Sequence, residues 1–186
     1  LVHDNSLWTP IGPIDGWSLR LTIGPTFHFQ RSKLHNYAGL LDFRYYYRIN
    51  HYFSFAQRSM IWLNDGVDIR RFYIGGSWGL RGYAINQIYG RKAILLNQEL
   101  RFPFAKSLML SIGSENIGFA PIRGALFIDA GNAWDYDYPG LRGSFGFGLR
   151  GLFMGGIVLR LDIGKRTDFR SISENWFTQF FFGWDF

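Results

Sequence analysis

The last eleven residues, Trp176 to Phe186, read WFTQFFFGWDF and carry an alternating pattern. Counted back in twos from the terminus, one face is aromatic at every position except Thr178: Phe186, Trp184, Phe182, Phe180 and Trp176. A transmembrane β-strand needs only about 9–11 residues and turns one face to lipid and the other to a lumen. The stretch therefore predicts a transmembrane strand whose aromatic face meets lipid.

The composition supports this class. The chain has 186 residues, which corresponds to one domain. Aromatic residues make up 19% and there are 23 glycines, as expected where rings line both membrane interfaces and small residues pack in a lumen. No run approaches the roughly 18 apolar residues of a membrane helix, so a helical membrane protein is excluded.

The cysteine content and the net charge exclude several classes of function. There is no cysteine, so disulfides, thiolate metal sites and cysteine nucleophiles are excluded. The net charge is +6, but the basic residues are scattered at strand spacing, which argues against nucleic-acid binding. With neither an initiating Met nor a signal peptide, we expect a processed or truncated chain whose export signal lay upstream.

Seven further segments alternate apolar with polar or small residues. They cover about residues 16–29, 36–49, 52–63, 93–104, 123–134, 143–153 and 156–165. In 93–104, for example, Leu100 and Phe102 oppose Glu99 and Arg101. The faces of 52–63 are the least clear, because Gln57 shares its face with apolar residues.

Eight such strands in up-and-down order with short links predict an all-β, antiparallel transmembrane barrel, because lipid cannot satisfy an open sheet edge. The alternative is a soluble antiparallel sheet with one wet face. Arg, Asp and Gly dominate the polar faces here, where a soluble sheet would favour Lys and Glu. A crowded lumen explains this better, because the fixed fork of Arg can hold a carboxylate through two hydrogen bonds.

One connection, at about residues 64–91, is long and contains Gly75-Gly76-Ser77-Trp78-Gly79-Leu80-Arg81-Gly82-Tyr83. A long connection in a compact chain is normally functional or disordered. Its content of Gly, Trp, Tyr and Arg argues against disorder, so we expect an ordered loop.

Several motifs now point to a family. Leu80-Arg81-Gly82-Tyr83 resembles the V/L-R-G-F/Y tip of the sixth extracellular loop of the BamA/TamA and two-partner-secretion transporter superfamily, also called the bacterial surface antigen family. Other segments resemble that family's strands in family order: Asn97 to Pro103, Phe127 to Asn132 (F-x-D-x-G), Gly146 to Arg150 (G-x-G-x-R), and Asp4 to Ser6 with Pro10 and Gly12. The aromatic C-terminal strand, with Phe180, Phe182, Trp184 and Phe186, also resembles the targeting signal of bacterial outer-membrane barrels.

The resemblance implies that the loop folds back into the lumen and that Arg81 pairs with Asp129. The receiving strands would then carry Phe127, Asp129, Gly131, Gly146, Gly148, Arg150, Glu99 and Arg101. The residues agree, because a lumenal carboxylate needs a cationic partner, and the three glycines leave room on the inner wall. In the alternative, Asp129 pairs with Arg123 or Arg150 and Arg81 lies in solvent.

Strand number sets the expected architecture. The family barrel has sixteen strands, and the matched motifs belong to its second half. An eight-stranded barrel is only wide enough for its own side chains and has no room for such a loop. We therefore expect the C-terminal half of a sixteen-stranded barrel, forming one segment over residues 1–186. A dimer of two such chains, or a closed eight-stranded barrel with its loop outside, are the alternatives.

The implied function is that of an outer-membrane assembly or translocation protein that inserts or exports client proteins. The implied location is the bacterial outer membrane or an organelle outer membrane of bacterial origin. Its partners would be outer-membrane lipid, client proteins and accessory periplasmic or lipoprotein subunits, with no nucleic acid. The competing function is a non-catalytic anchor or pore for an upstream domain or small solutes.

The sequence offers no sign of an enzyme. The four histidines show no metal-ligand spacing such as H-E-x-x-H, and no Ser sits in a G-x-S-x-G elbow. We therefore expect no catalytic residue, no metal and no cofactor.

Overall fold

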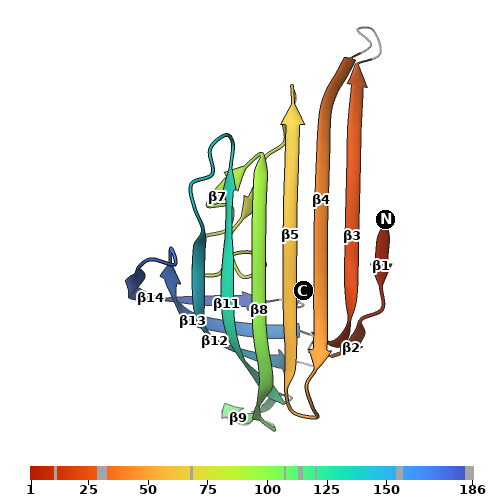
Figure 1. Ribbon diagram of the computed structural model, residues 1–186. Coiled ribbons are helices and arrows are strands. Elements are labelled where there is room, and N and C mark those ends of the chain that lie inside the picture. Colours follow the sequence, from red (N-terminus) through yellow and green to blue (C-terminus); the bar gives the residue numbers. More distant parts are fainter. Residues whose placement is uncertain are drawn as a thin grey trace.

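The structure is a computed structural model that describes residues 1–10, 12–28, 33–67, 69–106, 108–112, 115–119, 121–153 and 157–182. Its main body is one antiparallel sheet of long strands in chain order (Figure 1). These strands are β3 (Gly12–His28), β4 (Lys33–Arg48), β5 (Ser54–Gly66), β8 (Lys92–Ala105), β11 (Ile122–Trp134), β12 (Arg142–Phe153), β13 (Ile157–Thr167) and β14 (Ile172–Phe182). Each corresponds to one of the strands predicted from alternation.

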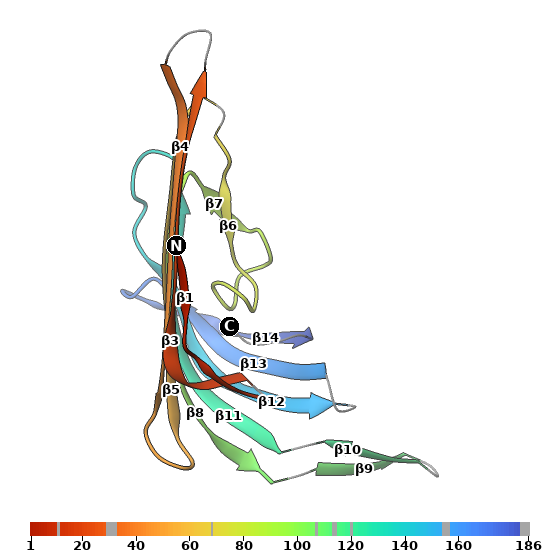
Figure 2. The ribbon, with the colours of Figure 1, turned by 90° about the vertical axis from the view of Figure 1, so that its right-hand side faces the viewer.

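The sheet is curved, with one concave and one convex face (Figure 2). On β8, the buried positions alternate strictly and include Asn97, Glu99 and Arg101. On β11 the buried set includes Phe127 and Asp129. The predicted faces are confirmed on both strands, and the register places Asp129 opposite Asn97 on β8 and Ser144 on β12.

Strand β3 begins earlier than the predicted start at about residue 16. It starts at Gly12, and two short strands, β1 (Val2–Asp4) and β2 (Leu7–Thr9), pair with its outer edge. Gly16 has a φ of 94°, and a Cβ there would lie 2.6 Å from the carbonyl oxygen of Asn5. A side chain at this position is therefore excluded by both conformation and space.

The expectation of short links everywhere except at 64–91 was wrong. The connection between β8 and β11 contains a second hairpin, β9 (Leu108–Ile112) and β10 (Glu115–Phe119). Its five-residue strands alternate too briefly to stand out from a turn in the sequence.

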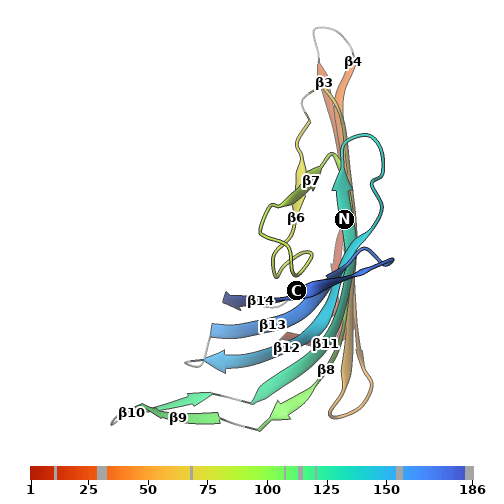
Figure 3. The same cartoon turned by 90° about the vertical axis from the view of Figure 1, so that its left-hand side faces the viewer.

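The described part of the connection between β5 and β8 lies on the concave side of the sheet (Figures 2 and 3). It holds its own two-stranded ladder, β6 (Phe72–Ile74) and β7 (Ile88–Gly90). Apolar residues of the loop pack against the wall in one cluster: Ile74, Leu80 and Ile88 with Met60, Ala93, Leu95 and Ala133. The alternative with the loop outside is therefore wrong.

The architecture is all-β and antiparallel. Among the described strands, β3 and β14 do not pair with each other, so the sheet is not closed. In the described part of the chain, no helix is long and apolar enough to cross a membrane.

Candidate functional site

The candidate site is the place where the loop meets the concave wall, and Arg81 is its centre. The Nε and Nη2 atoms of Arg81 each donate a hydrogen bond of 2.6 Å to Asp129 on β11. Its Nη1 atom donates to Glu99 Oε1 on β8, also at 2.6 Å. The pair implied by the resemblance is thus present, and one guanidinium joins the loop to two strands.

Glu99 is the second hub of the site. Besides Arg81, it accepts hydrogen bonds from Arg101, Arg150 and Arg160, at 3.0, 2.5 and 3.4 Å. Arg160 also donates to Asp162 at 2.7 Å. Arg150, the alternative partner of Asp129, donates to Glu99.

The electrostatics of this cluster follow from its charges. Four arginines (81, 101, 150 and 160) face three carboxylates (99, 129 and 162), which leaves a formal charge of 4 − 3 = +1. Each of the seven side chains is at most 4% exposed. Buried charges are tolerated only when they are paired and hydrogen-bonded, so loss of one partner disturbs several others.

Uncharged groups complete the shell around Arg81 and Asp129. Asn97 donates through one amide nitrogen to Asp129 and to the carbonyl of Gly79, at 2.9 and 2.8 Å. The guanidinium carbon of Arg81 lies 3.8 Å from the centre of the Phe127 ring, which adds a cation–π contact. Asn97 therefore holds the carboxylate and the loop backbone together.

The nearest neighbours of three inward glycines are atoms of the wall. The three atoms closest to a Cβ at Gly131, Gly146 or Gly148 belong to adjacent strands, among them the Phe127 ring at Gly146 and the Asp162 carboxylate at Gly148. Gly146 and Gly148 therefore leave room for two side chains that lie beside Arg81.

The loop tip also contacts the last described strand. Gly82 donates its amide to Gln179 Oε1, and Gln179 Nε2 donates to the carbonyl of Tyr83, both at 3.0 Å. Arg166 on β13 donates to the carbonyl of Gly82. Gly82 has a φ of 84°, and a Cβ there would lie 2.6 Å from the Phe177 ring, so the motif requires glycine at this place.

At its outer end the loop is tied to the connection after β11. Arg71 forms an exposed ion pair with Asp135 at 2.8 Å, and the amide of Arg91 donates to the same carboxyl at 3.1 Å. The hydrogen bond from Arg71 lowers the pKa of Asp135. Exposed pairs of this kind contribute little to stability, so the buried cluster dominates the attachment.

Sequence reasoning missed part of the site. Arg160, Asp162, Arg166 and Gln179 were not singled out, although all four occupy inward positions of β13 and β14. Their inward register was the available signal. On the opposite face, Phe180 and Phe182 are 57% and 61% exposed, whereas the predicted targeting residues Trp184 and Phe186 lie outside the described residues.

Comparison with protein families shows that the family model of the Omp85 superfamily domain matches residues 5–179 of the chain. The chain belongs to the Omp85 superfamily. Omp85 proteins are outer-membrane β-barrels of the assembly and translocation class, which agrees with the antiparallel sheet and the family expected from the motifs. No curated protein matches the chain.

The described His, Asp and Glu residues include no group of three or more that could hold a metal ion. Chemically, the site is suited to holding a loop in place through charge and hydrogen bonding.

Proposed function

We propose that this Omp85 chain forms half of a sixteen-stranded outer-membrane barrel that inserts or exports client proteins. The chemistry is non-covalent and needs no cofactor. A client strand adds to a sheet edge by main-chain hydrogen bonds, as in other cases of β-augmentation.

The observation that carries the proposal is the contact between the inward loop and β14. Through Gln179, the loop tip binds the strand whose second edge pairs with no other described strand. Such an edge presents unpaired amides and carbonyls that can template another strand. A loop that is anchored at Arg81 and also binds this strand is well placed to hold the edge in position while a client strand pairs.

Outer-membrane lipid is the proposed partner of the convex face, where Phe180, Phe182, Leu126 and Ile128 are exposed. Accessory periplasmic or lipoprotein subunits are proposed from the superfamily alone.

Site-specific disulfide cross-linking in the intact membrane tests the function. The chain has no cysteine, so Thr178→Cys on β14 and Gln98→Cys on the central strand β8 give matched outward positions. A stalled client with one cysteine in its final strand should cross-link at 178 and not at 98. Moving the client cysteine by one residue should abolish the product, because the side-chain period of a strand is two.

Equal cross-linking at 178 and 98, or indifference to the client register, would contradict strand addition. Absence of any client product would favour the anchor or pore instead.

A further inference from the structure

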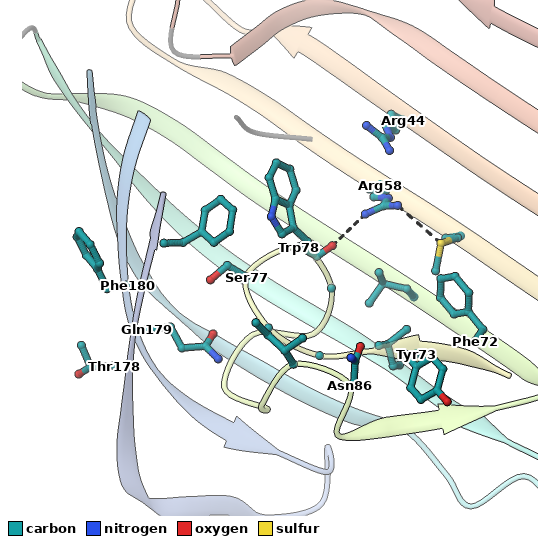
Figure 4. Close-up of a pocket in the computed structure, with 18 residues that line it drawn as sticks. Arg44, Arg58, Phe72, Tyr73, Ser77, Trp78, Asn86, Thr178, Gln179 and Phe180 are labelled. Carbon is teal, nitrogen blue, oxygen red and sulfur yellow. Dashed lines mark hydrogen bonds between the residues drawn. The ribbon is translucent and has the colours of Figure 1, made fainter. Parts of the chain in front are cut away.

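A cavity of about 710 Å³ lies between the loop, the β4–β5 wall and β14 (Figure 4). It is separate from the Arg81 cluster. Aromatic side chains from the loop and from β14 line it, among them Phe72, Tyr73, Trp78 and Phe181. Ligand pockets are typically of this size, and they combine apolar walls with a few fixed polar groups.

The charged residues among the described lining are Arg44 and Arg58. Both bind the same carboxylate with two hydrogen bonds each: Arg58 contacts Asp42 at 3.1 and 2.9 Å, and Arg44 contacts it at 3.2 and 2.9 Å. Two cations on one anion leave a formal charge of 2 − 1 = +1 at the cavity wall.

The side chains of Arg44 and Arg58 differ in their exposure to solvent. The Asp42 side chain is 9% exposed and that of Arg58 is 13% exposed, whereas Arg44 is 29% exposed. Arg58 also donates to the carbonyl of Trp78 at 3.0 Å, which fixes the loop wall of the cavity (Figure 4). Arg44 is therefore the accessible cation, held in one orientation by Asp42.

We propose that this cavity is a binding site for a phosphate group attached to an apolar or aromatic body. Arg44 donates to Asp42 through Nε and Nη2, and its Nη1 edge recognises the phosphate, because guanidinium N–H groups match phosphate oxygens. Ser77 and Asn86, which also line the cavity, supply uncharged polar groups. The rings of Phe72, Tyr73 and Trp78 cover the apolar body. The phosphate can belong to a lipid headgroup or to a free organic phosphate.

Isothermal titration of the purified full-length protein tests the site. The probes are inorganic phosphate, phenyl phosphate and dihexanoyl phosphatidic acid, with dihexanoyl phosphatidylcholine for comparison. Phenyl phosphate and phosphatidic acid should bind more tightly than inorganic phosphate, because only they fill the apolar part. Arg44→Gln should weaken both by roughly tenfold or more, the value of one charge-assisted hydrogen bond.

Two variants control for folding and for general charge. Arg44→Lys keeps the charge but loses the fork, so affinity should fall between wild type and Arg44→Gln. Arg48→Gln, on the same strand but outside the cavity lining, should bind like wild type. Arg44→Gln leaves Asp42 paired with Arg58, and heat-modifiable gel migration reports whether the barrel is folded.

Stronger binding of phosphatidic acid than of phenyl phosphate assigns the site to a lipid, and the reverse order assigns it to a free organic phosphate. Undetectable binding of every probe, unchanged affinity in folded Arg44→Gln, or equal loss in Arg48→Gln would overturn the proposal.

Discussion

At the scale of single residues, the ion pair between Arg81 and Asp129 attaches the loop to the wall. The two residues differ in the other side chains that they contact. Without Arg81, Asp129 keeps hydrogen bonds from the uncharged side chains of Asn97 and Ser144. Without Asp129, Arg81 still has Glu99 at 2.6 Å. The two residues should therefore respond unequally to mutation, although they form one ion pair.

We expect Arg81→Ala to lower the free energy of unfolding by roughly 3–5 kcal/mol, because it removes the guanidinium that donates two hydrogen bonds to the buried carboxylate of Asp129. Asp129→Ala should cost less, and the double variant should cost much less than the sum of the two single changes. Urea unfolding of the detergent-folded protein measures all three. Additive costs, or single costs of about 0–1 kcal/mol as for an exposed pair, would contradict a buried pair.

Gln179 offers a second residue-level prediction, because its one side chain bonds the loop backbone at Gly82 and Tyr83. Gln179→Ala removes two neutral hydrogen bonds and should destabilise the loop by about 1–3 kcal/mol. Limited proteolysis should then cut the loop faster. Thr178→Ala, on the opposite face of the same strand, is the control, and equal sensitivity in both variants would reject the contact.

At the scale of elements, strand β13 separates two environments. Leu161 lies mid-strand on the convex face, between Leu149 and Phe180 on the neighbouring strands. Leu161→Arg should destabilise the barrel by roughly 2–4 kcal/mol if this face meets the lipid interior. Refolding into lipid vesicles measures the cost. Arg at the exposed loop residue Val67 is the comparison, and similar tolerance at both positions would contradict the assigned face.

The long strands and their faces could be predicted from the sequence because alternation is a local property. Glu99 and Asp129 were correctly placed on inner faces in this way. The convergence of Arg150 and Arg160 on Glu99 could not be predicted, because they lie on two other strands, β12 and β13, whose register is set by the whole sheet. The strands β1, β2, β9 and β10 were missed because each has only three to five residues.

At the scale of the whole molecule, the loop lies on the concave side of the sheet (Figure 3). In the barrel proposed above, this position would place the loop in the lumen as an obstruction. Releasing it should open that lumen. We therefore expect Arg81→Ala to raise single-channel conductance in planar bilayers relative to the unaltered full-length protein. Gln98→Ala, on the outward face of β8, should leave conductance unchanged. If the unaltered protein, Arg81→Ala and Gln98→Ala all had the same conductance, the loop would not be the obstruction of the pore.

The position of the loop in the membrane is the central claim, and pulsed electron paramagnetic resonance tests it most directly. Because the chain has no cysteine, Ala84→Cys in the loop and Ser59→Cys on β5 can carry a pair of spin labels. A loop held at Arg81 predicts one narrow distance distribution, which becomes broad when Arg81→Ala is added. A broad distribution in the protein with Arg81 intact, or one that Arg81→Ala leaves unchanged, would contradict the account.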